Sequence, residues 1–296
     1  MKYATFVRLP RALCSCLVLA LFSASAQGDA PTPVSCGDTL MTPGKYVLTS
    51  DLVCDPPAIT IMASRVHLNM KGYSITNALP FGLGQSGVVV TGSNGHVVNG
   101  AVHGFLFGLL ITGDENKITN VTASGNLIGM FLCCDAEANR VIGNTANNNL
   151  SAPELEVVGV GIQDWDGAKN NIIKGNTANG NDAIGFLIGD FSPPPIPMKS
   201  ATITGNTANY NGDNGIVMLD GANGNLIRGN EFVGNTNFGI ASGSFTNNFP
   251  VDNLIQGNTA VDNGNADVAD FDPACANTWK SNTFATEGGV DPSCTD

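Results

Sequence analysis

Short apolar runs separated by glycine and asparagine recur along most of the chain. Runs such as residues 185–188 (Gly-Phe-Leu-Ile) and 215–219 (Gly-Ile-Val-Met-Leu) suit β-strands, whereas helices need longer runs with a 3.6-residue period. The 36 glycines and the many asparagines supply turns with positive φ that join short strands at sharp corners. The pattern predicts an all-β protein.

A tetrapeptide repeat sets the spacing of these strands. Gly-Asn-Thr-Ala occurs at 143–146, 175–178, 205–208 and 257–260, with a degenerate copy at 229–232. Its asparagines are 32, 30, 24 and 28 residues apart, which predicts a solenoid whose bare coil is about 24 residues and whose longer coils carry insertions. The columns Asn144, Asn176, Asn206, Asn230, Asn258 and Asn149, Asn181, Asn211, Asn235, Asn263 should therefore stack their side-chain amides between coils.

The segments Cys36-Gly37-Asp38-Thr39, Leu52-Val53-Cys54 and 66–75 look like the N-terminal part of secreted parallel β-helix proteins. With them, the chain resembles the right-handed parallel β-helix superfamily, whose fold is shared by pectate lyases, polygalacturonases and periplasmic NosD-type proteins. We therefore expect a solenoid of about eight coils and roughly 40 Å over residues 59–265, with caps at 27–58 and 266–296.

Residues 1–26 are typical of an export signal. Lys2, Arg8 and Arg11 precede the apolar run 12–22, and small residues follow at 24–26. No later run approaches the roughly 20 apolar residues of a transmembrane helix. The sequence thus predicts a secreted or periplasmic protein with no membrane partner.

Six cysteines follow the signal, an even number that suits an oxidising compartment. We expect disulfides between Cys36 and Cys54 and between Cys275 and Cys294, because each pair brackets one end of the solenoid. Two alternatives stay open for Cys133 and Cys134, a vicinal disulfide or two free thiols.

The charge balance narrows the choice of partner. Residues 27–296 contain 10 Lys and Arg against 25 Asp and Glu, which argues against nucleic acid. An anionic polysaccharide would also be repelled unless a divalent cation bridged it to the protein, so calcium is the one cofactor that we consider.

Acidic residues recur just after the apolar strands. Asp166, Asp190 and Asp220 each lie five residues after a strand glycine, and we expect Asp164 to point the same way as Asp166. Stacked coils would bring such carboxylates within about 5 Å, where they could hold calcium or catalyse glycoside hydrolysis. Asx-turn chemistry at a repeated corner is the alternative.

Other candidate residues follow from the repeat and from its interruptions. Lys174 and Arg228 share the position before Gly-Asn and could act on a uronate, or could only solubilise the surface. Trp165 and Tyr210 could stack on sugar rings. Insertions at 150–156, 190–197 and 244–250 should project from one face and carry specific contacts, unless they are neutral surface excursions.

Several family signatures are missing from the sequence. His67, His96 and His103 lack a Cys or Met arrangement typical of copper sites, and no His-x-His spacing occurs. The Asp-Pro-His-Asp run of alginate epimerases and the paired-Asp and Gly-His-Gly signatures of polygalacturonases are also missing.

The hypothesis from sequence is a monomeric, exported β-helix that binds an extracellular polysaccharide and cleaves it by β-elimination with calcium. Asp166, Asp190 and Asp220 would hold the cation, Lys174 or Arg228 would be catalytic, and Trp165 and Tyr210 would bind sugars. The alternative is a non-catalytic surface, adhesion or structural solenoid. Lyase activity requires Lys174 and the acidic column to share one groove with the insertions.

Overall fold

The structure is a computed structural model that describes residues 30–79, 85–155, 157–189, 198–289 and 292–295. The chain divides into a unit of residues 1–30 and a unit of residues 31–296, and the fold below is that of the second unit. The predicted signal peptide lies outside the described residues, and so does Asp190. Among the described residues, no helix is both long and apolar enough to cross a membrane.

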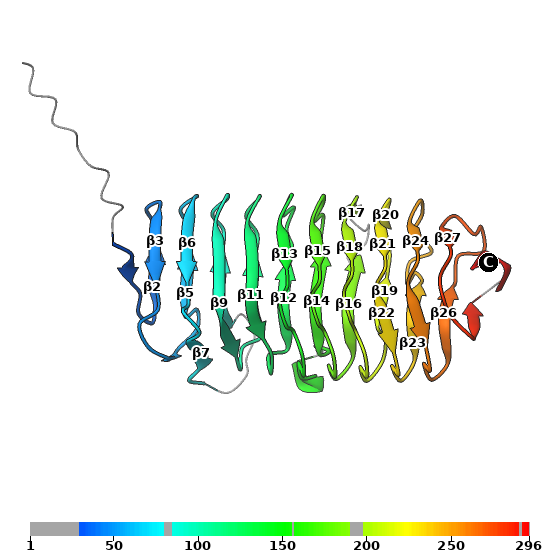
Figure 1. The fold of residues 1–296 in the computed structure, drawn as a ribbon, viewed down its shortest axis with the longest axis horizontal. Helices are drawn as coiled ribbons and strands as arrows, with labels where there is room; N and C mark the ends of the chain where they lie inside the picture. The colour runs from blue at the N-terminus through cyan, green and yellow to red at the C-terminus, as the bar shows by residue number, and fades with distance from the viewer. Residues whose placement is uncertain (1–29, 80–84, 156, 190–197, 290–291, 296) are drawn as a thin grey trace, which may run out of the picture. The chain divides into compact units, whose positions relative to one another are not determined.

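Two long parallel sheets form the body of this unit (Figure 1). Sheet 1 contains, in spatial order, β1 (Thr32–Pro33), β3 (Gly44–Val47), β6 (Val66–Asn69), β9 (His96–His103), β11 (Lys117–Ala123), β13 (Arg140–Ile142), β15 (Ile172–Lys174), β18 (Thr202–Thr204), β21 (Leu226–Arg228), β24 (Leu254–Gln256) and β27 (Thr278–Lys280), with β4 (Leu52–Cys54) and β7 (Ser74–Asn77) at its side. Sheet 2 contains β2 (Asp38–Leu40), β5 (Ile59–Ile61), β8 (Ser86–Val90), β10 (Phe107–Ile111), β12 (Ile128–Leu132), β14 (Val160–Trp165), β16 (Ile184–Gly189), β19 (Ile216–Met218), β23 (Phe238–Ser242), β26 (Ala266–Asp270) and β28 (Glu287–Gly289).

Smaller elements complete the coils. Short parallel pairs join β17 (Met198–Lys199) to β20 (Ala222–Asn223) and β22 (Glu231–Val233) to β25 (Thr259–Val261), and two 3₁₀ turns occur at η1 (Pro153–Leu155) and η2 (Pro292–Cys294). Residues 122, 145, 177 and 207, all threonine, form bridges along a third side. Each coil therefore passes from sheet 2 to sheet 1 and along this third side, so the predicted parallel β-helix is confirmed.

Side chains alternate between a closed core and the outside. In sheet 2, Ile162 pairs with Met130 and Phe186, and all three belong to one continuous core cluster. In sheet 1, Ile118, Val141, Ile173, Ile203 and Ile227 occupy the matching inward row. Because alternate residues of each strand point into the core, the residues between them point outward and form the surface.

Both predicted asparagine columns are present, and their amides hydrogen-bond from coil to coil. Asn206 is typical: its backbone N–H and its Nδ2 donate to Oδ1 of Asn230 at 2.9 and 3.0 Å, and its Nδ2 also donates to the carbonyl of Ile173 at 2.9 Å. Asn176 donates in the same way to Oδ1 of Asn206. The ladder thus pairs buried backbone groups at a corner where no sheet can pair them.

A third ladder was not predicted. It comprises Asn116, Asn139 and Asn171, and then Asn225, Asn253 and Asn277. In the coil between these two groups Ala201 takes the place, and its backbone N–H donates to Oδ1 of Asn225 at 2.9 Å. Because Ala201 interrupts the asparagine repeat, the sequence period does not reveal this column.

The glycine of Gly-Asn-Thr-Ala has a conformational role. Gly143, Gly175, Gly205 and Gly257 have φ between 61° and 64°, and the space where a Cβ would lie is open. Glycine is therefore preferred for its backbone conformation and not for close packing.

Three disulfides are present. Cys36 is joined to Cys54 and Cys275 to Cys294, as predicted for the two ends of the solenoid. Cys133 and Cys134 form a vicinal disulfide at the corner after β12, which decides between the two alternatives left open by the sequence.

We expect Asn206→Ala to lower the free energy of unfolding by about 3 kcal/mol, because it leaves the carbonyl of Ile173 and the donors of Asn176 buried without partners. Urea unfolding followed by circular dichroism measures this change. Asn248→Ala, at an exposed position, is the matched control. Equal losses in the two variants would contradict the role given to the ladder.

Candidate functional site

The outer face of sheet 2 carries an apolar surface that runs across several coils. Its buried members form a cluster separate from the core: Ile128, Val160, Trp165, Ala183, Ile184, Leu187, Val217 and Leu219, with Phe107, Phe131 and Val157 packed against it. The rings of Phe107 and Phe131 lie 5.0 Å apart on neighbouring strands. Because the members of this cluster are buried, it is a second packed region outside the core and not an exposed apolar patch.

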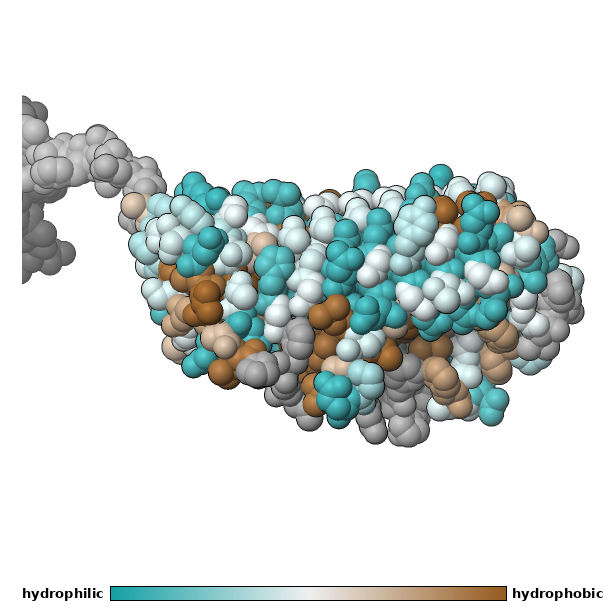
Figure 2. Space-filling model, turned by 90° about the horizontal axis from the view of Figure 1, so that it is seen from below, coloured by the Kyte–Doolittle hydropathy of each residue, from teal (hydrophilic) through white to brown (hydrophobic). Residues whose placement is uncertain are grey.

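A groove continues this face toward the C-terminal end. It has a volume of about 350 Å³ and crosses β19 and β23. Its lining residues are mainly aromatic and aliphatic, with two amides: Asn214, Val217, Leu219, Asn237, Phe238, Ala241, Gly243, Ser244, Phe245, Phe249 and Phe271. Phe238 and Phe271 meet edge to face at 5.7 Å. Figure 2 shows separate apolar areas on one face of an otherwise largely hydrophilic surface.

The insertion at 244–250 forms one wall of this groove and supplies Ser244, Phe245 and Phe249. Phe245 has 71% of its surface exposed and is available for contact with a ligand. Of the other predicted insertions, residues 190–197 lie outside the described residues, and residues 153–155 form η1.

Asp220 fixes this wall. The buried carboxylate accepts hydrogen bonds from the hydroxyl of Ser244, from the backbone N–H of Phe245 at 2.8 Å, and from the N–H and hydroxyl of Thr246 at 3.2 and 2.7 Å. Burial alone would raise the pKa of Asp220, but these donors lower it below 3.8. Three of these bonds end on Oδ1 and one ends on Oδ2. In the described structure, Asp220 therefore holds the loop that presents Phe245.

We expect Asp220→Ala to lower Tm by several degrees, because the donors of the 244–246 turn lose their acceptor. The loss should be the same with calcium and with a chelator, and Asp55→Ala, at an exposed position, should have little effect. If wild-type Tm instead fell in chelator and recovered with calcium, the calcium hypothesis would be supported.

The predicted site residues lie on three faces of the solenoid. Trp165 packs in the apolar cluster of sheet 2 with only 8% of its surface exposed. Lys174 and Arg228 end strands of sheet 1 and are exposed. Tyr210 lies at the end of the third side, 68% exposed and at φ 58°, a conformation that is costly for a bulky residue. The described structure does not bring these four residues into one groove.

The predicted acidic column lies at the corner between sheets 2 and 1. Asp166 follows β14 at φ 53°, and Asp220 follows β19. No group of three or more His, Cys, Asp or Glu side chains that could hold a metal ion occurs in residues 30–79, 85–155, 157–189, 198–289 or 292–295. Calcium binding stays a prediction, since Asp190 lies outside these ranges.

Asp164 does not point the same way as Asp166. It lies between Leu132 and Ile188 in an inward row of sheet 2 and is fully buried. Asn171 Nδ2 donates to its Oδ1 at 2.9 Å, while Oδ2 has no hydrogen-bond partner among the described residues. Burial raises the pKa of Asp164 to about 7, although the bond from Asn171 opposes the shift. The alternation Gln163-Asp164-Trp165 explains why this carboxyl enters the core.

Asp164 makes stability depend on pH. Folded Asp164 keeps its proton up to pH about 7, whereas the unfolded chain loses it near 3.8. The folded state therefore binds the extra proton between these values, and its stability should fall as pH rises, by on the order of 4 kcal/mol in all.

We expect Asp164→Asn to remove this loss, so that its stability advantage over wild type grows from pH 4 to pH 8. Urea unfolding at several pH values measures the difference. Asp262→Asn, an exposed control, should follow wild type. If Asp164→Asn also followed wild type, the buried carboxyl would not be the titrating group.

The histidines are paired with neighbouring groups. The rings of His67 and His96 lie 5.0 Å apart on adjacent strands, and His96 Nε2 is 2.6 Å from the hydroxyl of Thr119. His103 Nδ1 is 2.7 Å from the carbonyl of Ser124. The six cysteines of the exported chain are all in disulfides. These groups do not converge on a common point with a third metal ligand among the described residues.

Comparisons with known proteins place this geometry in context. Residues 58–266 match the family described as "Periplasmic copper-binding protein (NosD)". Among solved structures, the Dettilon tailspike protein matches with a TM-score of 0.60 at 15% identity, covering 88% of this chain and 61% of that one. The periplasmic alginate epimerase AlgG matches with a TM-score of 0.52 at 14% identity, covering 76% of this chain and 60% of that one. A search of curated proteins gave no match.

At these identities the solved structures support the fold alone, a right-handed parallel β-helix. The chain spans 61% and 60% of the length of these two proteins. Their activities therefore do not transfer with the fold.

Proposed function

The chain belongs to the NosD family of periplasmic β-helix proteins, and from this premise we propose that it is a secreted or periplasmic protein that binds an extracellular polysaccharide. The groove on sheet 2 is the observation that carries the proposal. Sugar rings have apolar faces and polar edges, and they stack on exposed aromatic rings while amides accept and donate at the rim. Phe238, Phe245 and Phe271, with Asn214 and Asn237, supply both kinds of contact.

Binding fits this groove better than cleavage does. None of the groove's described lining residues is titratable, whereas β-elimination and glycoside hydrolysis both require a positioned acid or base. Lys174 and Arg228, the predicted catalytic residues, lie on sheet 1 and not in the groove. We therefore propose a binding role and derive no catalytic step.

The family description names copper, and the donor set found here does not fit a copper site. Copper in proteins takes several imidazole, thiolate or thioether ligands that converge on one point. The three histidines have other neighbours, the described cysteines are oxidised, and the described residues hold no cluster of three His, Cys, Asp or Glu side chains. No copper chemistry is assigned to this chain.

The test is the binding of a panel of soluble polysaccharides to the mature protein by isothermal titration calorimetry. We expect Phe245→Ala to weaken binding about tenfold without lowering Tm, because this ring is exposed and contributes contact area rather than core packing. Met62→Ala, an exposed apolar position near the other end, is the control.

Tyr210→Ala separates the two candidate sugar platforms. If this variant weakens binding and Phe245→Ala does not, the contact lies on the third side, as the sequence-based assignment of Tyr210 requires. Absence of binding to every polysaccharide in the panel would overturn the proposal.

A further inference from the structure

Cationic side chains stack on the outer face of sheet 1. Lys45 pairs in register with His67, His67 with His96, His96 with Lys117, and Lys117 with Arg140. These five residues come from five consecutive strands, so neighbours are separated by roughly 4.8 Å. Lys45, Lys117 and Arg140 are exposed, and the two histidines are half-buried.

From β15 onward the cations lie in a second outward row, two residues further along each strand. Lys174 pairs with Thr204, Thr204 with Arg228, Arg228 with Gln256, and Gln256 with Lys280. We call these eight side chains, six Lys or Arg and two His, the cationic stripe: Lys45, His67, His96, Lys117, Arg140, Lys174, Arg228 and Lys280. It includes six of the ten Lys and Arg of residues 27–296 and extends over roughly 43 Å.

No carboxylate neutralises these cations within the strands. The other residues in the two outward rows of sheet 1, such as Thr204 and Gln256, are neutral. The one ion pair found in the described part of the chain joins Lys169 to Glu137 at 3.5 Å, outside the stripe. In a chain of net charge −12, the positive charge is therefore concentrated on one face.

The stripe also shows the effect of crowding like charges. The pKa of His96 is lowered, first by burial and then by the neighbouring charges of His67 and Lys117. At the N-terminal end, a hollow of about 230 Å³ is lined by Lys45, His67 and Lys71 together with Pro31, Tyr46, Val47 and Asn69. An anion seated on this face would relieve the repulsion that the protein leaves uncompensated.

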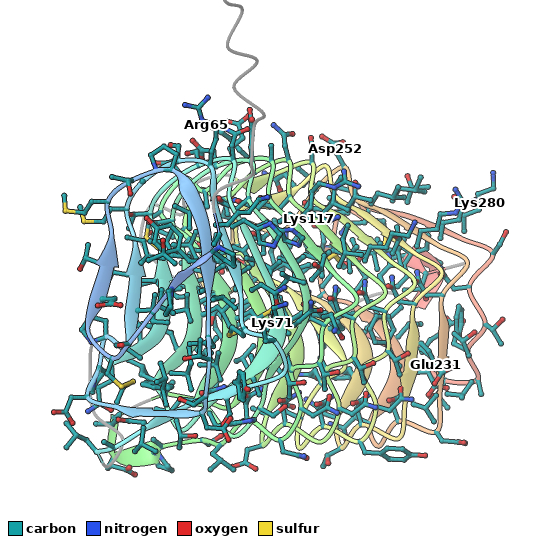
Figure 3. All side chains as sticks on the ribbon, turned by 60° about the vertical axis from the view of Figure 1, so that its left-hand side comes forward. Arg65, Lys71, Lys117, Glu231, Asp252 and Lys280 are labelled. Carbon is teal, nitrogen blue, oxygen red and sulfur yellow. A yellow bond between two sulfur atoms is a disulfide. The ribbon has the colours of Figure 1, made fainter. Side chains whose placement is uncertain are left out.

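The narrowness of the stripe limits the width of the polyanion that can bind to it. Carboxylates lie at the corner just before these strands: Asp114, Glu115, Glu137 and Asp252. In Figure 3, Asp252 projects from this corner, beside the side that carries Lys117 and Lys280. A broad and dense polyanion such as duplex DNA would meet these carboxylates, whereas a single thin chain would not.

We propose that the cationic stripe binds one strand of a linear acidic polysaccharide laid along the solenoid axis, with its carboxylate or sulfate groups facing successive coils. The proposal rests on the proposed function for the class of partner, but it uses a different face from the aromatic groove. It also removes the need for a bridging cation, because the two outward rows of sheet 1 contain no carboxylate.

The test compares polygalacturonate with the same polymer after methyl esterification, which keeps the sugar backbone and removes its charge. Binding to the mature protein is measured over a series of salt concentrations. We expect polygalacturonate to bind more tightly at low salt, with an affinity that falls as salt rises. The double variant Lys117→Gln with Arg140→Gln should bind it at least tenfold more weakly and with a shallower salt dependence.

The matched control is Arg65→Gln with Lys169→Gln, which removes the same charge from exposed or half-exposed positions off the stripe. It should bind within about twofold of wild type, and both doubles should keep the wild-type Tm. If the two double variants bind polygalacturonate equally well, or if the esterified and free polymers bind the wild-type protein equally well, the stripe is not the binding site.

Phe245→Ala is also tested on the esterified polymer, to separate failure of the stripe from failure of the proposed function. If Phe245→Ala weakens binding while the two double variants bind alike, only the stripe fails and the polysaccharide-binding proposal stands. A single-stranded oligonucleotide that binds more tightly than polygalacturonate of equal charge would instead show that the partner class is wrong.

Discussion

The side-chain amides at the coil corners are the interaction on which the rest of the structure depends. A parallel β-helix pairs its strands in sheets, but its corners leave backbone N–H and C=O groups inside the body with no sheet partner. Asn206 satisfies such groups: its own backbone N–H and Nδ2 donate to the next amide, and its Nδ2 also donates to the carbonyl of Ile173. At the last coil Asp267 accepts from the backbone N–H and Nδ2 of Asn263, and Asp270 accepts from Nδ2 of Asn277. Two of the three columns therefore end on carboxylates, which have no leftover donor, and the third ends on Asn282, whose Nδ2 donates to the carbonyl of Ile255.

This scaffold separates structural from functional positions. Inward rows and corner amides repeat because every coil must meet the same core and the same ladder. The residues that differ from coil to coil are outward or inserted, and they produce distinct surfaces: a phenylalanine-lined groove whose wall is held by Asp220, and a row of cations on the adjoining sheet. Neither surface contributes to the core cluster.

The sequence predicted the fold, both repeated asparagine columns and the two terminal disulfides, because periodic residues and bracketing cysteines report directly on stacking. It did not predict the third amide column, which Ala201 interrupts. The direction of side chains was harder to predict, because the register of a short strand decides which of its alternate residues point inward. Asp164 enters the core, and Trp165 is covered by apolar neighbours. Within the cationic stripe the sequence showed only the shared position of Lys174 and Arg228. The members from Lys45 to Arg140 were missed, because they are 21–29 residues apart and share no motif.

The amide ladder has a direction, since each Oδ1 accepts from the preceding coil and each Nδ2 donates to the following one. Every internal coil consequently offers the same acceptor at one boundary and the same donor at the other. A bare coil, such as the 24 residues between Asn206 and Asn230, can be duplicated or deleted as a unit without leaving an unmatched amide. The length of the protein can thus change in evolution by whole coils, and a lateral surface grows or shrinks with it while both ends stay the same.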